Sequence, residues 1–112
     1  MNRNVELAIS LYKEKEEEIE RIVKLEEILE KINEILERLK KTTIEGKGSS
    51  ILAGAIYLGA MVEEVDRGTM TFRANFNETK ITQKKVGETL KVSENTVSKY
   101  YVEIIKKLTK IE

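Results

Sequence analysis

The stretch that decides the fold is "ITQKKVGETLKVSENTVSKYY", residues 81–101. Its pattern predicts a helix of about two turns, a three-residue turn and a second helix, over residues 83–90, 91–93 and 94–108. Thr82 and Ser93 have the residue type of helix N-caps, because a side-chain oxygen there can accept from an unpaired backbone N–H of the first turn. The stretch therefore predicts a helix-turn-helix.

The spacing of apolar and small residues fits that motif. Two helices that cross tightly need a small residue where they approach, and apolar residues that lock both helices to the turn. The residues at these positions are Val86, Gly87, Leu90, Val92, Val97 and Tyr100. The one departure is Lys91, where a glycine in the left-handed conformation is commonest, so a lysine carries a conformational cost.

If the second helix enters a major groove, the exposed residues of its N-terminal half face the bases. These candidates are Glu94, Asn95, Ser98 and Lys99. A second set would contact phosphates, either through lysine charge or at the helix N-termini. It consists of Thr82, Lys84, Lys85, Lys91 and Ser93. Lys106, Lys107 and Lys110 either extend the backbone contact or form a solvated face at the end of the helix.

Charge is unevenly distributed, although the formal net charge is zero. Residues 1–40 hold 8 Lys and Arg against 11 Glu, whereas residues 80–112 hold 8 Lys against 4 Glu. A local excess of lysine attracts polyanions. The basic C-terminal third thus coincides with the predicted DNA-binding motif.

The N-terminal segment, residues 1–41, predicts one long amphipathic helix or two helices broken within "KEKEEEIE" (residues 13–20). Apolar residues follow a heptad seam from Ile22 to Leu39, widened by Ile28 and Ile35. This face either packs on the rest of its own domain or forms a homodimer through residues 19–39.

The middle of the chain predicts a break, a buried helix and a loop. Glycines within residues 42–50 end the first helical segment, and Ser49 or Ser50 can cap the next helix. Residues 49–62 are apolar on nearly every side, which predicts a central buried helix. Residues 63–80 then form a short extended segment or a packed loop, which Phe72 and Phe76 are expected to anchor in the core.

The composition excludes several kinds of chemistry. The chain has no Cys and no His, which excludes disulfides and thiolate or imidazole sites. Nothing offers a paired acid and base or a phosphate cradle, so we expect no enzyme, catalytic residue, metal or cofactor. The apolar run is too short for a membrane span of about 20 residues, and the first residues lack the order of a signal peptide. We therefore expect an intracellular, cytoplasmic protein without membrane contact.

The segments "KGSSILAGAIYLGAM" (residues 47–61) and "ITQKKVGETLKVSENTVSKYYVEIIKKL" (residues 81–108) resemble the second cyclin-like repeat of the archaeal and eukaryotic transcription initiation factor IIB family. In that family the first segment is the central buried helix and the second is the helix-turn-helix. The matching positions are Gly48, Ser49, Ile51, Ala53, Ala55, Tyr57, Leu58, Thr82, Gln83, Val86, Leu90, Val92, Glu94, Thr96, Val97 and Tyr101. The resemblance implies an all-α, cyclin-like domain. Residues 1–41 would be a long amphipathic helical segment whose second half is the first helix of the repeat, and residues 42–112 would be the remainder, with the helix-turn-helix at 82–108.

The departures from the family bear on function. There is one repeat and no Cys for a zinc ribbon, so we expect no role as a general initiation factor. Ser98 and Tyr100 stand where the family carries arginines that read the promoter, which predicts a different target sequence. The function expected is regulation of transcription through binding of double-stranded DNA. The alternative is a protein-binding module that contacts the TATA-binding protein or other basal components without touching DNA.

Overall fold

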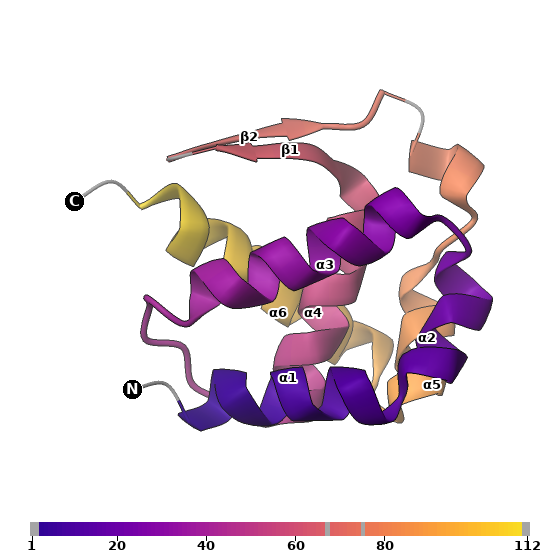
Figure 1. The fold of residues 1–112 in the computed structure, drawn as a ribbon, viewed down its shortest axis with the longest axis horizontal. Helices are drawn as coiled ribbons and strands as arrows, with labels where there is room; N and C mark the ends of the chain where they lie inside the picture. Colours follow the sequence, from indigo (N-terminus) through magenta and orange to yellow (C-terminus); the bar gives the residue numbers. More distant parts are fainter. Residues whose placement is uncertain (1–2, 67, 75, 111–112) are drawn as a thin grey trace.

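The computed structural model describes residues 3–66, 68–74 and 76–110, with the side chains of residues 76 and 77 excepted. This part of the chain is mostly helical, with a small two-stranded sheet (Figure 1). Its elements in chain order are α1 Arg3–Glu14, α2 Glu16–Val23, α3 Glu26–Leu39, α4 Gly48–Met61, β1 Val62–Asp66, β2 Thr69–Phe72, the 3₁₀ helix η1 Phe76–Thr79, α5 Gln83–Leu90 and α6 Glu94–Thr109.

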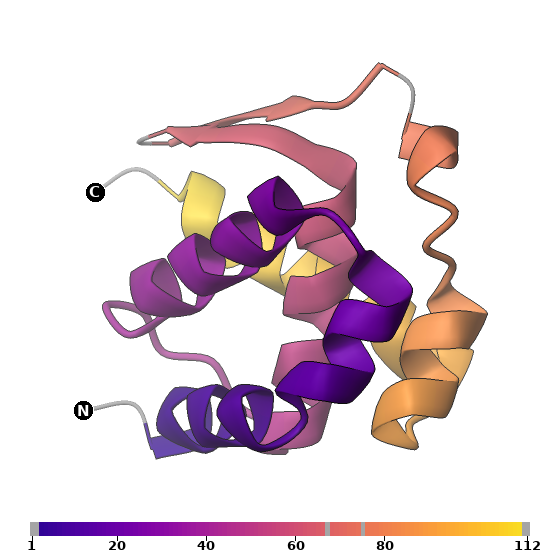
Figure 2. The same ribbon diagram turned by 45° about the vertical axis from the view of Figure 1, so that its right-hand side comes forward.

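Helix α4 forms the centre of the molecule, as the sequence predicts. It packs against α1, α3 and α6, which lie around it in both ribbon views (Figures 1 and 2). Its side chains are buried along almost the whole helix, because a helix that is apolar on every side can be covered on every side. Small residues bring the neighbours close: a Cβ on Gly54 would lie 2.7 Å from the Tyr100 carbonyl carbon. Residues 1–41 and 42–112 thus share one core.

The prediction of one or two N-terminal helices is wrong, because there are three. One break falls at Lys15, inside the predicted segment, and a second falls at Lys24 and Leu25. Lys24 takes the left-handed conformation, with φ 63°, and its N–H bonds to the Glu20 carbonyl, which ends α2. The chain can then turn, so that α2 and α3 lie on different sides of the molecule (Figure 2).

The heptad seam is consequently not continuous. Leu25 sits at the break and is 46% exposed. The apolar residues of α3 face the protein's own core, where Ile28, Ile32, Ile35, Leu36 and Leu39 are buried. Of the two interpretations of the seam, packing on its own domain is therefore what the structure shows for α3. A homodimer through residues 19–39 stays a prediction, and it would have to use the exposed residues of this segment, such as Leu25, in place of these five.

The link between α3 and α4 corrects two further expectations. Helix α3 ends at Leu39, well before the glycines, and the Thr42 hydroxyl donates to the Leu39 carbonyl at 2.9 Å. Helix α4 starts at Gly48 with Lys47 in the cap position, so neither Ser49 nor Ser50 is its cap. Both serines lie inside the first turn, where the Ser50 N–H bonds to the Lys47 carbonyl at 3.1 Å.

Residues 62–72 form a hairpin that the sequence did not predict in full. Strand β1 pairs antiparallel with β2, and an irregularity lies between Val62 and Glu64. Both strands, except for Val62 at the start of β1, fall within residues 63–80, which the sequence predicts as a short extended segment or a packed loop. The pairing of two strands was not predicted, and the chain is therefore not purely α-helical. The hairpin is tied to α3, since the Arg38 guanidinium donates to the Val65 carbonyl at 3.1 Å.

The expected anchoring of this region by phenylalanine is wrong for Phe72, which is 45% exposed. The buried residues of the hairpin are Val62 and Val65 of β1. The bulge shifts the alternation of β1, so these two residues, three apart, share the inner face. The Phe76 side chain lies outside the described part.

Tyr12 of α1 is buried, and its hydroxyl donates to the Leu29 carbonyl at 3.3 Å. Burial, and then the charges of Glu16 and Glu20, raise its pKa to about 12. The phenol of the unfolded chain loses its proton near pH 10, before the folded one does. The stability linked to this group is therefore present below pH 10 and is lost between pH 10 and 12.

We expect Tyr12→Phe to reduce the fall in the free energy of unfolding between pH 10 and pH 12 by roughly 2 kcal/mol. Guanidinium unfolding at pH 9 and pH 11.5 measures it, because phenylalanine keeps the ring and removes the titration. An equal fall in the two proteins would contradict the assignment.

Candidate nucleic-acid interface

Helices α5 and α6 begin at the residues that the sequence predicts. The Thr82 hydroxyl accepts from the Lys85 N–H at 3.1 Å, and the Ser93 hydroxyl accepts from the Thr96 N–H at 3.1 Å. Both caps are therefore confirmed. Because each cap satisfies a backbone donor that would otherwise be unpaired, the three residues between the helices suffice as a connection.

The turn between the two helices depends on a close approach at Gly87. The Val92 N–H bonds to the Gly87 carbonyl at 2.9 Å, and a Cβ on Gly87 would lie 2.6 Å from the Val92 carbonyl oxygen. Lys91 adopts the left-handed conformation with φ 58°. The small residue and the strained lysine thus occupy the places predicted for them.

The predicted anchors attach both helices to the rest of the protein. Val86, Leu90 and Val97 are buried, and Val92 and Tyr100 pack partly buried against the core. Near the middle of α6, the rings of Tyr101 and Tyr57 meet edge to face, with centroids 5.2 Å apart. Burial, followed by the neighbouring Tyr57, raises the pKa of Tyr101. These contacts hold α6 against the core and leave its outer face at the surface.

The predicted DNA-contacting residues are at the surface. Ser98 is half-buried, and the others are exposed: Thr82, Lys84, Lys85, Lys91, Ser93, Glu94, Asn95 and Lys99. Asn95 and Lys99 lie on one face of α6, since residues four apart on a helix are neighbours. Further steps of three and four residues add Val102 and Lys106, both exposed, to what we call the α6 stripe. Val102, which is 43% exposed, was missed in the sequence, although its spacing could have indicated it.

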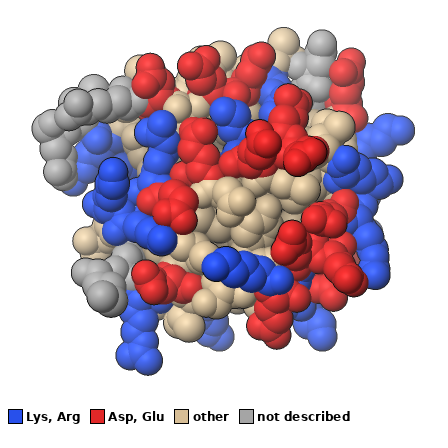
Figure 3. Space-filling model, in the orientation of Figure 1, with Lys and Arg blue, Asp and Glu red and all other residues tan. Residues whose placement is uncertain are grey.

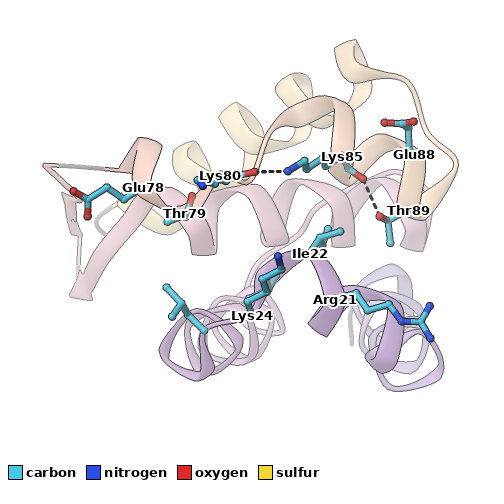
Figure 4. A pocket seen from close by; sticks show the side chains of 11 residues that line it. Arg21, Ile22, Lys24, Glu78, Thr79, Lys80, Lys85, Glu88 and Thr89 are labelled. Atoms are coloured by element: carbon cyan, nitrogen blue, oxygen red, sulfur yellow. Dashed lines mark hydrogen bonds between the residues drawn. The ribbon is translucent and has the colours of Figure 1, made fainter.

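The structure does not bring all predicted lysines together. Lys84 lies in the first turn of α5, whereas Lys91 is the residue after its end and takes the left-handed conformation. The Lys85 side chain points toward Lys80, and its Nζ donates to the Lys80 carbonyl at 3.1 Å (Figure 4). There it lines a groove of about 600 Å³ together with Arg21 and Lys24. Lys85 is thus separate from the surface that the α6 stripe defines.

The loop between α3 and α4 borders α6, which the sequence could not indicate. Residues 43–46 line a hollow of about 520 Å³ together with Lys99, Tyr100, Glu103 and Lys107 of α6. Gly46, at φ 124°, lies so close to the Tyr100 ring that any Cβ there would overlap the ring. The loop, which carries the exposed lysines Lys40, Lys41 and Lys47, is therefore held against α6 at Gly46.

Charges differ between the two sides of the molecule. Figure 3 views the face over α1 and α3, where many acidic side chains gather, whereas α6 lies behind them in this orientation. The acidic residues exposed on α1 to α3 are Glu6, Glu14, Glu16, Glu17, Glu18, Glu20, Glu26, Glu27, Glu30 and Glu37. Lysines predominate on α5 and α6, although Glu88, Glu94 and Glu103 interrupt them.

Among residues 3–66, 68–74 and 76–110, no group of three or more Asp and Glu side chains is arranged to hold a metal ion. None of the helices in this part of the chain is long and apolar enough to cross a membrane.

Comparisons with known proteins found no match to a protein-family model, to a curated protein or to a solved structure.

Proposed function

We propose that α5 and α6 are a DNA-binding helix-turn-helix and that the protein regulates transcription by binding double-stranded DNA. The observation that carries the proposal is the α6 stripe, an exposed row of residues on a capped helix that rests on a rigid core. A helix of this kind fits a major groove and presents side chains to the base edges.

The chemistry of the stripe suits base recognition. An asparagine amide can pair with adenine, a lysine ammonium can donate to guanine, and an apolar side chain can contact a thymine methyl group. Asn95, Lys99 and Val102 supply these three groups in order along α6. Glu94, at the start of the helix, can accept from a cytosine amino group. The stripe would thus read a short sequence that differs from the promoter element of the family named above.

Phosphate contacts would come from both flanks of α6. Lys84 lies on α5 and Lys91 directly after its end, whereas Lys41 and Lys47 lie on the loop that Gly46 locks against Tyr100. Lys41 and Lys47 have no ion-pair partner among the described residues, so their charges remain available to a polyanion. A helix in a major groove has a phosphate strand on either side, which matches this arrangement.

The fold supports a relationship to one cyclin-like repeat. The resemblance of residues 47–61 and 81–108 to the transcription initiation factor IIB family predicts a fully buried central helix followed by the two-helix motif. A central buried α4 and the α5–α6 pair are arranged in that order. We therefore propose a single cyclin-like repeat, to which we assign no catalytic residue, metal or cofactor.

A protein-binding module is the second candidate. Glu88, Glu94 and Glu103 are acidic side chains on the same two helices, and DNA phosphates would repel them. On this alternative the surface contacts the TATA-binding protein or another basal component without touching DNA.

The two functions are separated by selection from a random pool of duplex DNA at low salt, followed by salt titration of the recovered sequence. We expect a preferred sequence, with an affinity that falls steeply as salt rises. Absence of binding even at low salt would overturn the proposal and leave the protein-binding module.

Replacement of Lys91 by glycine is expected to raise the stability of the protein and to lower the salt dependence of its DNA affinity. Lys91→Gly removes a left-handed lysine, so we expect the free energy of unfolding to rise by about 1 kcal/mol. It also removes a phosphate contact, so the slope of log affinity against log salt should fall by about 0.9. Chemical unfolding and salt titration measure the two effects. Lys24→Gly relieves the same strain away from α6 and should leave the slope unchanged, and an unchanged slope for Lys91→Gly would exclude the contact.

A further inference from the structure

The groove between the α2–α3 link and the η1–α5 segment has no part in the proposed DNA contact. Figure 4 shows its two walls, with Ile22 and Lys24 on one and Lys80 and Lys85 on the other. The apolar residues Ile22, Val23 and Leu25 contribute to its lining. We call this the basic groove, because four cations line it against two carboxylates, Glu78 and Glu88.

The cations of the basic groove are not neutralised by ion pairs within the described part of the chain. Arg21, Lys24 and Lys80 form no ion pair with any described residue, and the Lys85 Nζ donates to the Lys80 carbonyl while keeping two further hydrogens. Glu88 points away from α2 (Figure 4). The groove thus presents unneutralised positive charge beside exposed apolar surface, of which Leu25 is the most exposed part.

The opposite charge lies at the other end of the same helix. Five glutamates surround the start of α2 and line a surface hollow, and we call them the acidic block: Glu14, Glu16, Glu17, Glu18 and Glu20. Within this block only Glu18 has an ion-pair partner among the described residues, Lys15, at 4.0 Å. The acidic block and the basic groove therefore lie toward the two ends of α2.

The macrodipole of α2 accounts for part of this pattern and not for all of it. Glutamates at the N-terminus and Arg21 near the C-terminus stabilise a helix. The dipole gives no reason for the two further lysines, Lys80 and Lys85, that a segment about 60 residues away brings to the basic end. Nor does it account for the exposed apolar Leu25 among them.

We propose that the occupant of the basic groove is a second copy of this chain, whose acidic block enters the groove across a two-fold axis. A surface that carries both charges side by side is complementary to itself when one copy is rotated by half a turn, so both contacts form at once. The apolar residues Ile22 and Leu25, which line the groove, would then be buried against the partner. The inference does not depend on DNA binding.

The lining of the basic groove favours a protein segment over a polyanion. A phosphate chain would leave the apolar side chains Ile22 and Leu25 uncovered. The acidic block, in contrast, belongs to a helix that also carries apolar residues. Since the contact rests largely on exposed ion pairs, the dimer is expected to be weak and to loosen roughly tenfold between 0.05 M and 0.5 M salt.

A charge exchange tests the dimer by sedimentation at low salt, without DNA. One variant is Arg21→Glu/Lys24→Glu and the other is Glu16→Lys/Glu17→Lys. Each alone places like charges across both contacts, so we expect the dissociation constant to rise at least about tenfold. In an equimolar mixture both contacts are again of opposite sign, and association should return to the wild-type level.

The control variant is Lys106→Glu/Lys110→Glu, which makes the same change of charge on exposed residues of the C-terminal region and should leave association unchanged. All replaced side chains are exposed, and thermal unfolding checks that each variant is folded. A wild-type protein that remains monomeric at millimolar concentration would overturn the inference. So would a mixture that fails to associate, or an Arg21/Lys24 variant that only loses DNA affinity.

Discussion

Gly54→Ala is expected to lower the free energy of unfolding by about 2 kcal/mol, although alanine is the better helix former. A Cβ at this position would lie 2.7 Å from the Tyr100 carbonyl carbon, 2.8 Å from its Cβ and 2.9 Å from its oxygen. The obstacle is mainly backbone, so α6 as a whole must move away from α4. Guanidinium unfolding gives the change in free energy.

Gly59→Ala is the matched control in the same helix. Its Cβ would lie at the same distance, 2.7 Å, but from the Cγ1 side-chain atom of Ile32, while the nearest backbone atom is 3.4 Å away. A side chain can shift without moving its helix, and the gain in helix propensity of about 1 kcal/mol offsets the cost. We expect a loss below about 1 kcal/mol. Equal losses for the two variants would contradict the argument that backbone contact decides the cost.

The second large effect concerns the α6 stripe. Lys99→Ala and Asn95→Ala are each expected to weaken binding of the selected DNA sequence roughly tenfold or more, because one good base contact discriminates by about 1–3 kcal/mol. Both side chains are exposed, so the free energy of unfolding should change by less than about 0.5 kcal/mol. Titration of labelled duplexes with the selected and a scrambled sequence measures affinity and specificity together.

Lys13→Ala is the control, since it removes an equal charge from exposed α1. It should leave both affinities unchanged. The scrambled duplex distinguishes base contacts from phosphate contacts. If Asn95 binds a base, its replacement weakens only the selected sequence, whereas a residue that binds phosphate affects both duplexes alike. If both stripe variants bind the selected duplex as the wild type does, α6 does not read DNA.

The parts of the fold that sequence predicts are those set by neighbours in the chain. Thr82 and Ser93 bond to the N–H three residues on, and Gly87 meets Val92 five residues on, so short patterns contain the whole interaction. The burial of α4 is equally predictable, because it follows from the apolar composition of that helix alone. These features include most of the candidate site.

The parts that sequence does not predict depend on residues distant in the chain. No local signal favours a left-handed lysine at position 24, and that conformation persists because the core requires α2 and α3 to diverge. Strand β1 follows directly from α4 and carries no turn residue at the junction. The contact of Gly46 with Tyr100 joins positions 54 residues apart, so the flank of the α6 stripe could not be foreseen.

The separation of charge between the α1–α3 face and the α5–α6 side gives the protein an electric dipole moment, although its net charge is zero. A neutral molecule feels no net pull in a uniform field, but a dipole feels a torque. Near a polyanion the protein would turn its lysines inward before contact. This orientation acts only within about one Debye length, roughly 8 Å at physiological salt. The molecule would therefore approach DNA without long-range attraction and align in the last step of the encounter.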